Sequence, residues 1–180
     1  MTKLRNRRAF ALAGTALALS IALSGCSTIN DLIGLSSGDA QRDEDTGEVT
    51  EGSNIDIFAL KVGDCMPTSD TSGEITDADV VPCAEPHADE VFFEFSLAEG
   101  ELPTDEEITT EVEAQCIPAF SEFVGIDYYD SALDFWWLTP TEKTWTQADD
   151  RLVQCVLYEP DPADPEVSLV VTGTLEGAAR

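Results

Sequence analysis

The stretch PTDEEITTEVEAQCIPAFSEFVG, residues 103–125, decides the fold, because it predicts the principal helix. Thr104 and Glu107 match a capping box, and Gly125 is a residue at which helices commonly end. Pro118 should kink the helix or end it early, since it lacks a backbone N–H. Apolar side chains recur at helical spacing along one face: Ile108, Val112, Cys116, Phe120 and Phe123. This stripe predicts a helix that packs against a sheet.

Strand patterns lie on both sides of the helix. Residues 90–97 alternate between two faces, and the same alternation recurs over residues 151–159. The side chains that we expect on the buried faces are Val91, Phe93, Phe95 and Leu97, then Val153, Cys155 and Leu157. Shorter strands are expected at residues 55–60, 79–83, 134–138 and 168–174. The elements predict an α+β fold: a small, mostly antiparallel twisted sheet of five or six strands, with one principal helix on one face.

Four of the five cysteines lie within the part of the chain that contains these predicted strands and the helix: Cys65, Cys83, Cys116 and Cys155. The first 25 residues indicate that the chain is exported, and an even number of cysteines in an exported chain predicts disulfides. Four cysteines allow three pairings. We favour Cys65–Cys83 and Cys116–Cys155, because Cys116 on the buried helical stripe would face Cys155 on the sheet. A zinc site is the rival interpretation. The chain has no CxxC motif and a single histidine, which disfavours zinc.

The first 25 residues resemble an export signal. Four basic residues among the first eight precede an apolar run over residues 9–23, about 15 residues long and too short to span a bilayer. Residues 23–26 read Leu-Ser-Gly-Cys, which is similar to a lipobox. We therefore expect residues 1–25 to be a lipoprotein signal peptide and Cys26 to carry the lipid. A plain signal peptide or an uncleaved anchor are the alternatives, and all three place the remaining chain outside the cytoplasm.

The remaining chain is expected to have three parts. Residues 26–54 contain few apolar side chains, which predicts a flexible acidic tether after the lipidated cysteine. Residues 55–175 are expected to form one folded domain, and residues 176–180 a disordered tail. On this interpretation the protein is anchored by lipid at the extracytoplasmic face of the cell membrane.

The charge of the chain limits its partners. The whole sequence has a net charge of −27, with 9 basic and 36 acidic residues. Nucleic-acid binding is excluded, since it needs a basic surface. The simplest interpretation of the acidic surface is solubility. Binding of calcium or of a basic partner is the sharper alternative, although no segment has the ligand spacing of an EF-hand loop.

Several short motifs recur in a recognisable order. They are Val62-Gly63-Asp64-Cys65, Val81-Pro82-Cys83, Pro86-His87, Glu90-Val91, a helical cysteine, Pro140-Thr141, Trp145, and Asp150-Arg151 before Cys155. Their order and spacing, over about residues 58–158, resemble the septum formation family of actinobacterial exported and membrane-anchored proteins. One departure is Asp149, which stands where that family pattern leads us to expect a glycine. The resemblance implies a role near the division septum, and it implies no cofactor and no catalytic residue.

Two candidate sites follow from the residues themselves. His87 could act as a general base or a pH switch. We favour a structural role, in which its ring ties the turn over residues 83–90 together by hydrogen bonds. A possible interaction surface is expected at the aromatic concentration formed by Trp136, Trp137, Trp145, Tyr128 and Tyr129. The alternative for this concentration is a core cluster around the Cys116–Cys155 pair.

The sequence thus predicts a non-catalytic, lipid-anchored module that is associated with the envelope or with cell division. Its partners would be the membrane, through Cys26, and an envelope protein or cell-wall material. Two other classes stay open: a small-ligand carrier that uses the aromatic residues, and a small envelope enzyme that uses paired carboxylates or His87.

Overall fold

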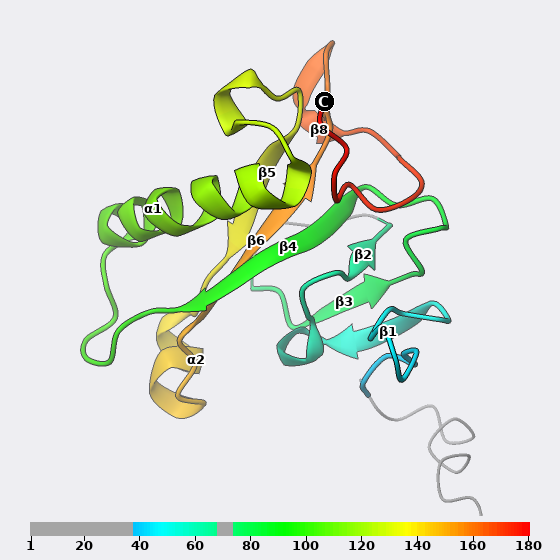
Figure 1. The fold of residues 1–180 in the computed structure, drawn as a ribbon. Helices are drawn as coiled ribbons and strands as arrows, with labels where there is room; N and C mark the ends of the chain where they lie inside the picture. Colours follow the sequence, from blue (N-terminus) through cyan, green and yellow to red (C-terminus); the bar gives the residue numbers. More distant parts are fainter. Residues whose placement is uncertain (1–37, 68–73) are drawn as a thin grey trace, which may run out of the picture. The chain divides into compact units, whose positions relative to one another are not determined.

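A computed structural model describes residues 38–67 and 74–180 of the chain (Figure 1). The expected signal peptide, Cys26 and the first part of the expected tether lie outside the described residues. Within the described ranges, no helix combines the length and the apolar character that a membrane crossing requires.

A four-stranded antiparallel sheet forms the centre of the fold, with the strand order β2-β4-β6-β5. Its strands are β2 (Cys65–Met66), β4 (Asp89–Ser96), β6 (Leu152–Tyr158) and β5 (Asp134–Leu138). The two long strands, β4 and β6, pair along their length and occupy the middle. Residues 153–157 of β6 are all buried, because both faces of this strand are covered. The predicted antiparallel α+β architecture is confirmed.

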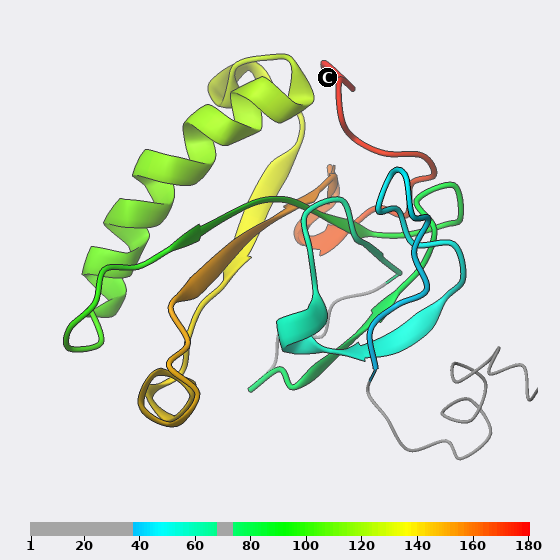
Figure 2. The same cartoon turned by 60° about the horizontal axis from the view of Figure 1, so that its bottom comes forward.

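Helix α1 (Asp105–Val124) covers one face of this sheet (Figures 1 and 2). Its buried side chains are Ile108, Val112, Cys116, Phe120 and Val124. The predicted stripe is therefore confirmed except at its end, where Val124 replaces the half-buried Phe123. The capping box at Thr104 is present, and Gly125 ends the helix with a φ of 84°. A disulfide joins Cys116 to Cys155 of β6, as predicted.

Pro118 neither ends nor divides the helix, contrary to our expectation. Its side chain is exposed, so it lies on the face of α1 that points to solvent. The backbone carbonyl that loses its partner at a proline can be hydrated on this side, so its loss costs less than it would in the buried stripe.

A second core, which the sequence did not predict, covers the opposite face of the sheet. A two-stranded antiparallel sheet, β1 (Ser53–Asp56) with β3 (Asp77–Val80), lies on that side (Figure 2). The buried residues of this core are Ala40, Val49, Ile55, Leu60, Met66, Val80, Val91 and Val156. The second predicted disulfide, Cys65–Cys83, links β2 to the chain that follows β3. The structure therefore has three layers: a helix, a four-stranded sheet and a two-stranded sheet.

A β-bulge in β4 changes which of its side chains share a face. The pairing with β6 shifts between Val91 and Phe93, so that Phe92 has no partner. Phe92, Phe93 and Phe95 consequently all contact the helix-side core, whereas Val91 belongs to the second core. Our assignment of Val91 to the same face as Phe93 was wrong, because one extra residue reverses the alternation.

Short elements complete the fold: the 3-10 helices η1 (Ile57–Ala59) and η2 (Tyr128–Asp130), helix α2 (Glu142–Gln147), and the hairpin β7 (Pro160–Asp161) and β8 (Asp164–Ser168). The strand expected at residues 168–174 is not formed. β8 ends where that strand was to begin, and the following chain makes a single bridge from Val171 to His87.

Both ends of the described chain are better ordered than the sequence suggested. Residues expected to belong to the flexible tether include Ala40 and Val49, which are buried in the second core. The expected disordered tail is also held: Gly177 donates to the carbonyl of Phe123, and Arg180 forms an ion pair with Glu159. The folded unit thus extends beyond residues 55–175 in both directions, because isolated apolar residues and single charges, too sparse to predict order, find partners in the fold.

The turn before β6 generates a prediction. Asp149 has a φ of 56°, in the left-handed region where glycine is favoured, so the turn forms without the expected glycine. We predict that Asp149→Ala lowers the free energy of unfolding by about 1 kcal/mol, because alanine is strained there and has no side-chain hydrogen bond. Asp149→Gly should retain full stability. Both variants lose the exposed ion pair with Arg151. Equal stability of the two in chemical denaturation would contradict the backbone argument.

Candidate functional site

A groove of about 260 Å³ lies at the end of β5 and β6, beside η1 and α2. Its apolar lining consists of Ile57, Phe58, Ile75, Trp136, Trp137, Leu138 and Leu152. Its polar lining includes Glu74, Thr141, Asp150 and Gln154. A second hollow of about 260 Å³ adjoins it along η1 and reaches Lys143 of α2. Aromatic side chains are enriched at protein contact surfaces, where polar residues form the rim.

Two aromatic residues of the groove are exposed. Phe58 of η1 is 55% exposed, and its backbone N–H is held by the carboxylate of Asp56 at 2.9 Å. Trp137 of β5 is 37% exposed, and its ring lies 6.3 Å from that of Phe135. Rigid aromatic side chains at a surface supply contact area at a low cost in conformational entropy.

The adjacent Trp136 is placed on the opposite face of β5, as the alternation of a strand requires. Its indole N–H donates to Asp89 at 3.0 Å, and its ring packs against the second core. Trp136 therefore packs against the second core and not against the helix-side core. It forms the wall of the groove and belongs at the same time to the second core.

The other predicted surface residues lie elsewhere. Trp145 is buried in the helix-side core, with its indole N–H donating to the carbonyl of Gly100 and the guanidinium of Arg151 3.7 Å above its ring. Tyr128 is half-buried and donates to Asp134 at 2.8 Å. Burial, with this bond to Asp134, raises the pKa of Tyr128 to about 12. Tyr129 is 78% exposed but does not line the groove.

The predicted aromatic cluster is thus divided among a core, a groove and an isolated surface position. Phe58 and Ile75, which line the groove together with the two tryptophans, were not predicted from the sequence. They precede the tryptophans by more than 60 residues, and only the tertiary fold brings η1 beside β5.

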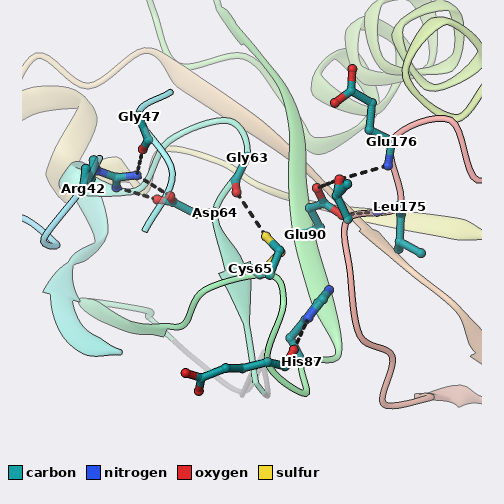
Figure 3. Close-up of a disulfide and its surroundings, with 12 residues drawn as sticks. Arg42, Gly47, Gly63, Asp64, Cys65, His87, Glu90, Leu175 and Glu176 are labelled. Carbon is teal, nitrogen blue, oxygen red and sulfur yellow. Dashed lines mark hydrogen bonds and ion pairs between the residues drawn. A yellow bond between two sulfur atoms is a disulfide. The ribbon is translucent and has the colours of Figure 1, made fainter. Parts of the chain in front are cut away.

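His87 is fully buried and serves the turn, as we favoured (Figure 3). Its Nδ1 lies 2.9 Å from the carbonyl oxygen of Glu85, which makes this nitrogen the donor. Its Nε2 is buried and has no hydrogen-bond partner among the described residues. Its backbone bonds in both directions with Val171. A general base needs access to a substrate, and this side chain has no exposed surface.

Glu90 is a buried carboxylate near His87. It accepts hydrogen bonds of 2.6 Å from the hydroxyl of Thr174 and from the backbone N–H of Leu175 (Figure 3). Burial raises the pKa of Glu90, against the opposing effect of these bonds and of His87. The arrangement holds the C-terminal segment on β4.

The Val-Gly-Asp-Cys motif has a structural explanation. Asp64 is fully buried and forms a two-nitrogen ion pair with Arg42, in which Nη2 lies 2.7 Å from Oδ2 (Figure 3). The backbone N–H of Lys61 donates to the same carboxylate at 2.9 Å. Gly63 has a φ of 90° and donates to the carbonyl of Val91. Removing one partner of such a pair costs about 3–5 kcal/mol, so Arg42 fixes the segment around residues 38–49 on the domain.

One group of possible metal ligands occurs among the described residues: Cys65, Cys83 and Glu90, whose ligand atoms lie within 4.8 Å of one another. The two sulfur atoms are joined in a disulfide and are therefore not thiolate ligands. These three residues lie close together because of the disulfide and of the pairing between β2 and β4. The group therefore offers zinc no thiolate ligand.

The buried Glu90 generates a prediction about pH. Its pKa in the folded state lies above the ordinary value of 4.5, so its contribution to stability is fully present below pH 4.5 and is lost as the pH rises through the folded-state pKa. Glu90→Gln keeps an oxygen acceptor for Leu175 and removes the titration. We predict that the variant gains stability relative to the wild type as the pH rises from about 4 to about 8. Chemical denaturation across this range tests it, with Glu122→Gln, an exposed glutamate of α1, as the control for loss of one charge. A loss of stability of the variant relative to the wild type as the pH rises would contradict the prediction.

Comparison with known families gives one match. A family model described as septum formation covers residues 38–179, which includes both cores, both disulfides and the whole groove. No curated protein and no solved structure matches the chain. The match begins at residue 38 and so includes the segment that Arg42 holds on the domain through Asp64.

Proposed function

This chain belongs to the septum formation family, and on that premise we propose that it is a lipid-anchored, non-catalytic interaction module of the cell envelope that acts at the division septum. The observation that carries the proposal is the extent of the family match, which covers nearly all of the folded unit. The family is named for a process of cell division and not for a reaction. A septal role requires position and contact rather than turnover.

Burial of the candidate catalytic groups supports a non-catalytic role. His87 has no exposed surface, and Glu90 is engaged by Thr174 and Leu175. Both groups hold the C-terminal segment against β4. An envelope enzyme built on His87 would have to break this segment away to admit a substrate.

The groove at Phe58 and Trp137 is the surface that we assign to an envelope protein partner. It is an open groove with exposed aromatic side chains in its lining, whereas small-molecule sites enclose most of the surface of their ligand. This geometry favours contact with a partner over enclosure of a ligand, and it therefore weighs against the carrier alternative. Cell-wall glycan remains the other class of partner, which the experiments below distinguish.

Position in the cell is the first prediction of this proposal. A fluorescently tagged chain should be enriched at the septum of dividing cells, where the proposed role places it. The proposed lipid on Cys26 should hold it at the membrane there. Cys26→Ala should remove the membrane association and the enrichment together. Uniform staining of the envelope by the wild-type protein would contradict the septal role, and unchanged staining of the variant would contradict the lipid anchor.

Contact through the groove is the second prediction. A photoreactive amino acid at position 137 should give a discrete, protein-sized crosslinked product in dividing cells, because this side chain is partly exposed in the groove. The same residue at position 129 is the matched control, since Tyr129 is an exposed aromatic outside the groove. Products that disappear after digestion with a wall-degrading glycosidase would identify glycan instead. Equal products from both positions would contradict the assignment of the groove.

A further inference from the structure

One edge of the central sheet is unpaired. β2 pairs only with Asp89 and Glu90 of β4, and the last bonds on this side join Val91 to residues 63 and 64. Beyond Val91, β4 continues to Ser96 with no neighbouring strand on this side in the described part of the chain (Figure 1). We propose that this free edge of β4 receives an extended, lysine- or arginine-rich segment of a partner protein as an added strand. The proposal goes beyond the proposed function, since this edge lies across the sheet from β5 and its groove.

The backbone of the edge is correctly oriented to pair. Leu97 donates to the carbonyl of Arg151, which makes Leu97 and Phe95 the residues that bond to β6. Backbone groups alternate along a strand, so Glu94 and Ser96 direct their N–H and C=O away from β6. Both residues are exposed. An edge of this kind is a template for another strand, and β-strand addition is a recurring mode of peptide recognition.

A groove of about 810 Å³ runs beside this edge, between β4 and the first half of α1. Phe95, Leu97 and Leu102 give it an apolar lining. Its acidic residues are Glu101, Glu107 and Glu111, with Glu94 on the neighbouring edge. No lysine or arginine is among its lining residues. An added strand would therefore lay its side chains over apolar atoms with carboxylates at the rim.

The charge of this rim selects the occupant. Lysine and arginine side chains have apolar stems and charged ends. They suit a groove whose lining combines the apolar Phe95 and Leu102 with the carboxylates of Glu107 and Glu111. A second copy of the chain is disfavoured. Antiparallel pairing of two β4 edges would bring Glu94 and the acidic half of α1 together with their copies, in a protein of net charge −27. A basic extended segment can form backbone hydrogen bonds with the edge, and its positive charge complements the carboxylates beside it.

The experiment uses the full chain in detergent micelles and the fluorescein-labelled heptapeptide KVKVKVK at about 0.15 M salt, where long-range attraction is screened. Amide hydrogen exchange at Glu94 and Ser96 should slow at least about tenfold when the peptide saturates the protein, because added strands protect edge amides. The amides of β5 should not change. Equal protection at both edges, or none at Glu94 and Ser96, would overturn the proposal.

Two peptides separate strand addition from simple charge attraction. KVKVKVK methylated on its central backbone nitrogens keeps its charge but cannot donate to the edge. It should bind at least about tenfold more weakly in fluorescence anisotropy, as expected for the loss of two or more hydrogen bonds. EVEVEVE should not bind. Equal binding of the methylated peptide would show that only a polyelectrolyte interaction exists, and would overturn the proposal without affecting the septal role.

Variants of the protein test the same edge. Ser96→Pro removes an N–H that points away from β6 and so spares the ladder, which is the one setting in which proline is tolerated in a strand. It should abolish protection and binding, whereas Ser96→Ala should bind as the wild type does. Glu111→Gln should weaken binding about threefold, and Glu122→Gln, at the other end of α1, should leave it unchanged. Should Ser96→Pro fail to fold, the Glu111 and Glu122 pair and the methylated peptide still decide the question.

Discussion

The disulfide between Cys116 and Cys155 is the constraint on which the arrangement of the layers depends. Cys155 lies in the middle of β6, which pairs with β4 on one side and β5 on the other. Cys116 lies midway along the buried stripe of α1. The bond therefore fixes the helix over the centre of the sheet. With a sequence separation of 39 between the two cysteines, its stabilisation by the chain-entropy account is about 4 kcal/mol.

The coverage of the sheet determines where a partner can bind. The α1 layer covers one face, and the β1–β3 layer, with the segment held by Arg42, covers the other. What remains open in the described structure is the periphery: the groove at Phe58 and Trp137 beside β5, and the free edge of β4. The buried ionisable residues His87 and Glu90 hold the C-terminal segment against β4. Buried polar groups thus maintain the fold, and the open surfaces lie at the edges, which is the arrangement that the proposed interaction module requires.

Local patterns in the sequence were sufficient for the helix, the strands β4, β5 and β6, and both disulfides. The helix and the strands depend on periodicity or on a cap within about 20 residues, and the disulfide pairing followed from the even number of cysteines and the place of Cys116 on the helical stripe. The second core was not predictable in this way, because it is assembled from isolated residues such as Ala40 and Val49. The bulge at Phe92 was also invisible, since a single extra residue leaves the alternation of the strand looking intact. The groove needs Phe58 of η1 and Trp137 of β5 in one lining, and only the tertiary structure brings these two elements together.

Hydrogen exchange in a chain that lacks the Cys116–Cys155 bond tests this account of the fold most directly. In the Cys116→Ala/Cys155→Ala variant, the account predicts that amides of α1 exchange much faster while those of β1 and β3 retain their protection, because the second core does not depend on this disulfide. The Cys65→Ala/Cys83→Ala variant should show the reverse bias, with faster exchange around β2 and the end of β3. Loss of protection that is uniform over all three layers in the first variant would contradict the claim that the disulfide holds one layer on an otherwise stable sheet.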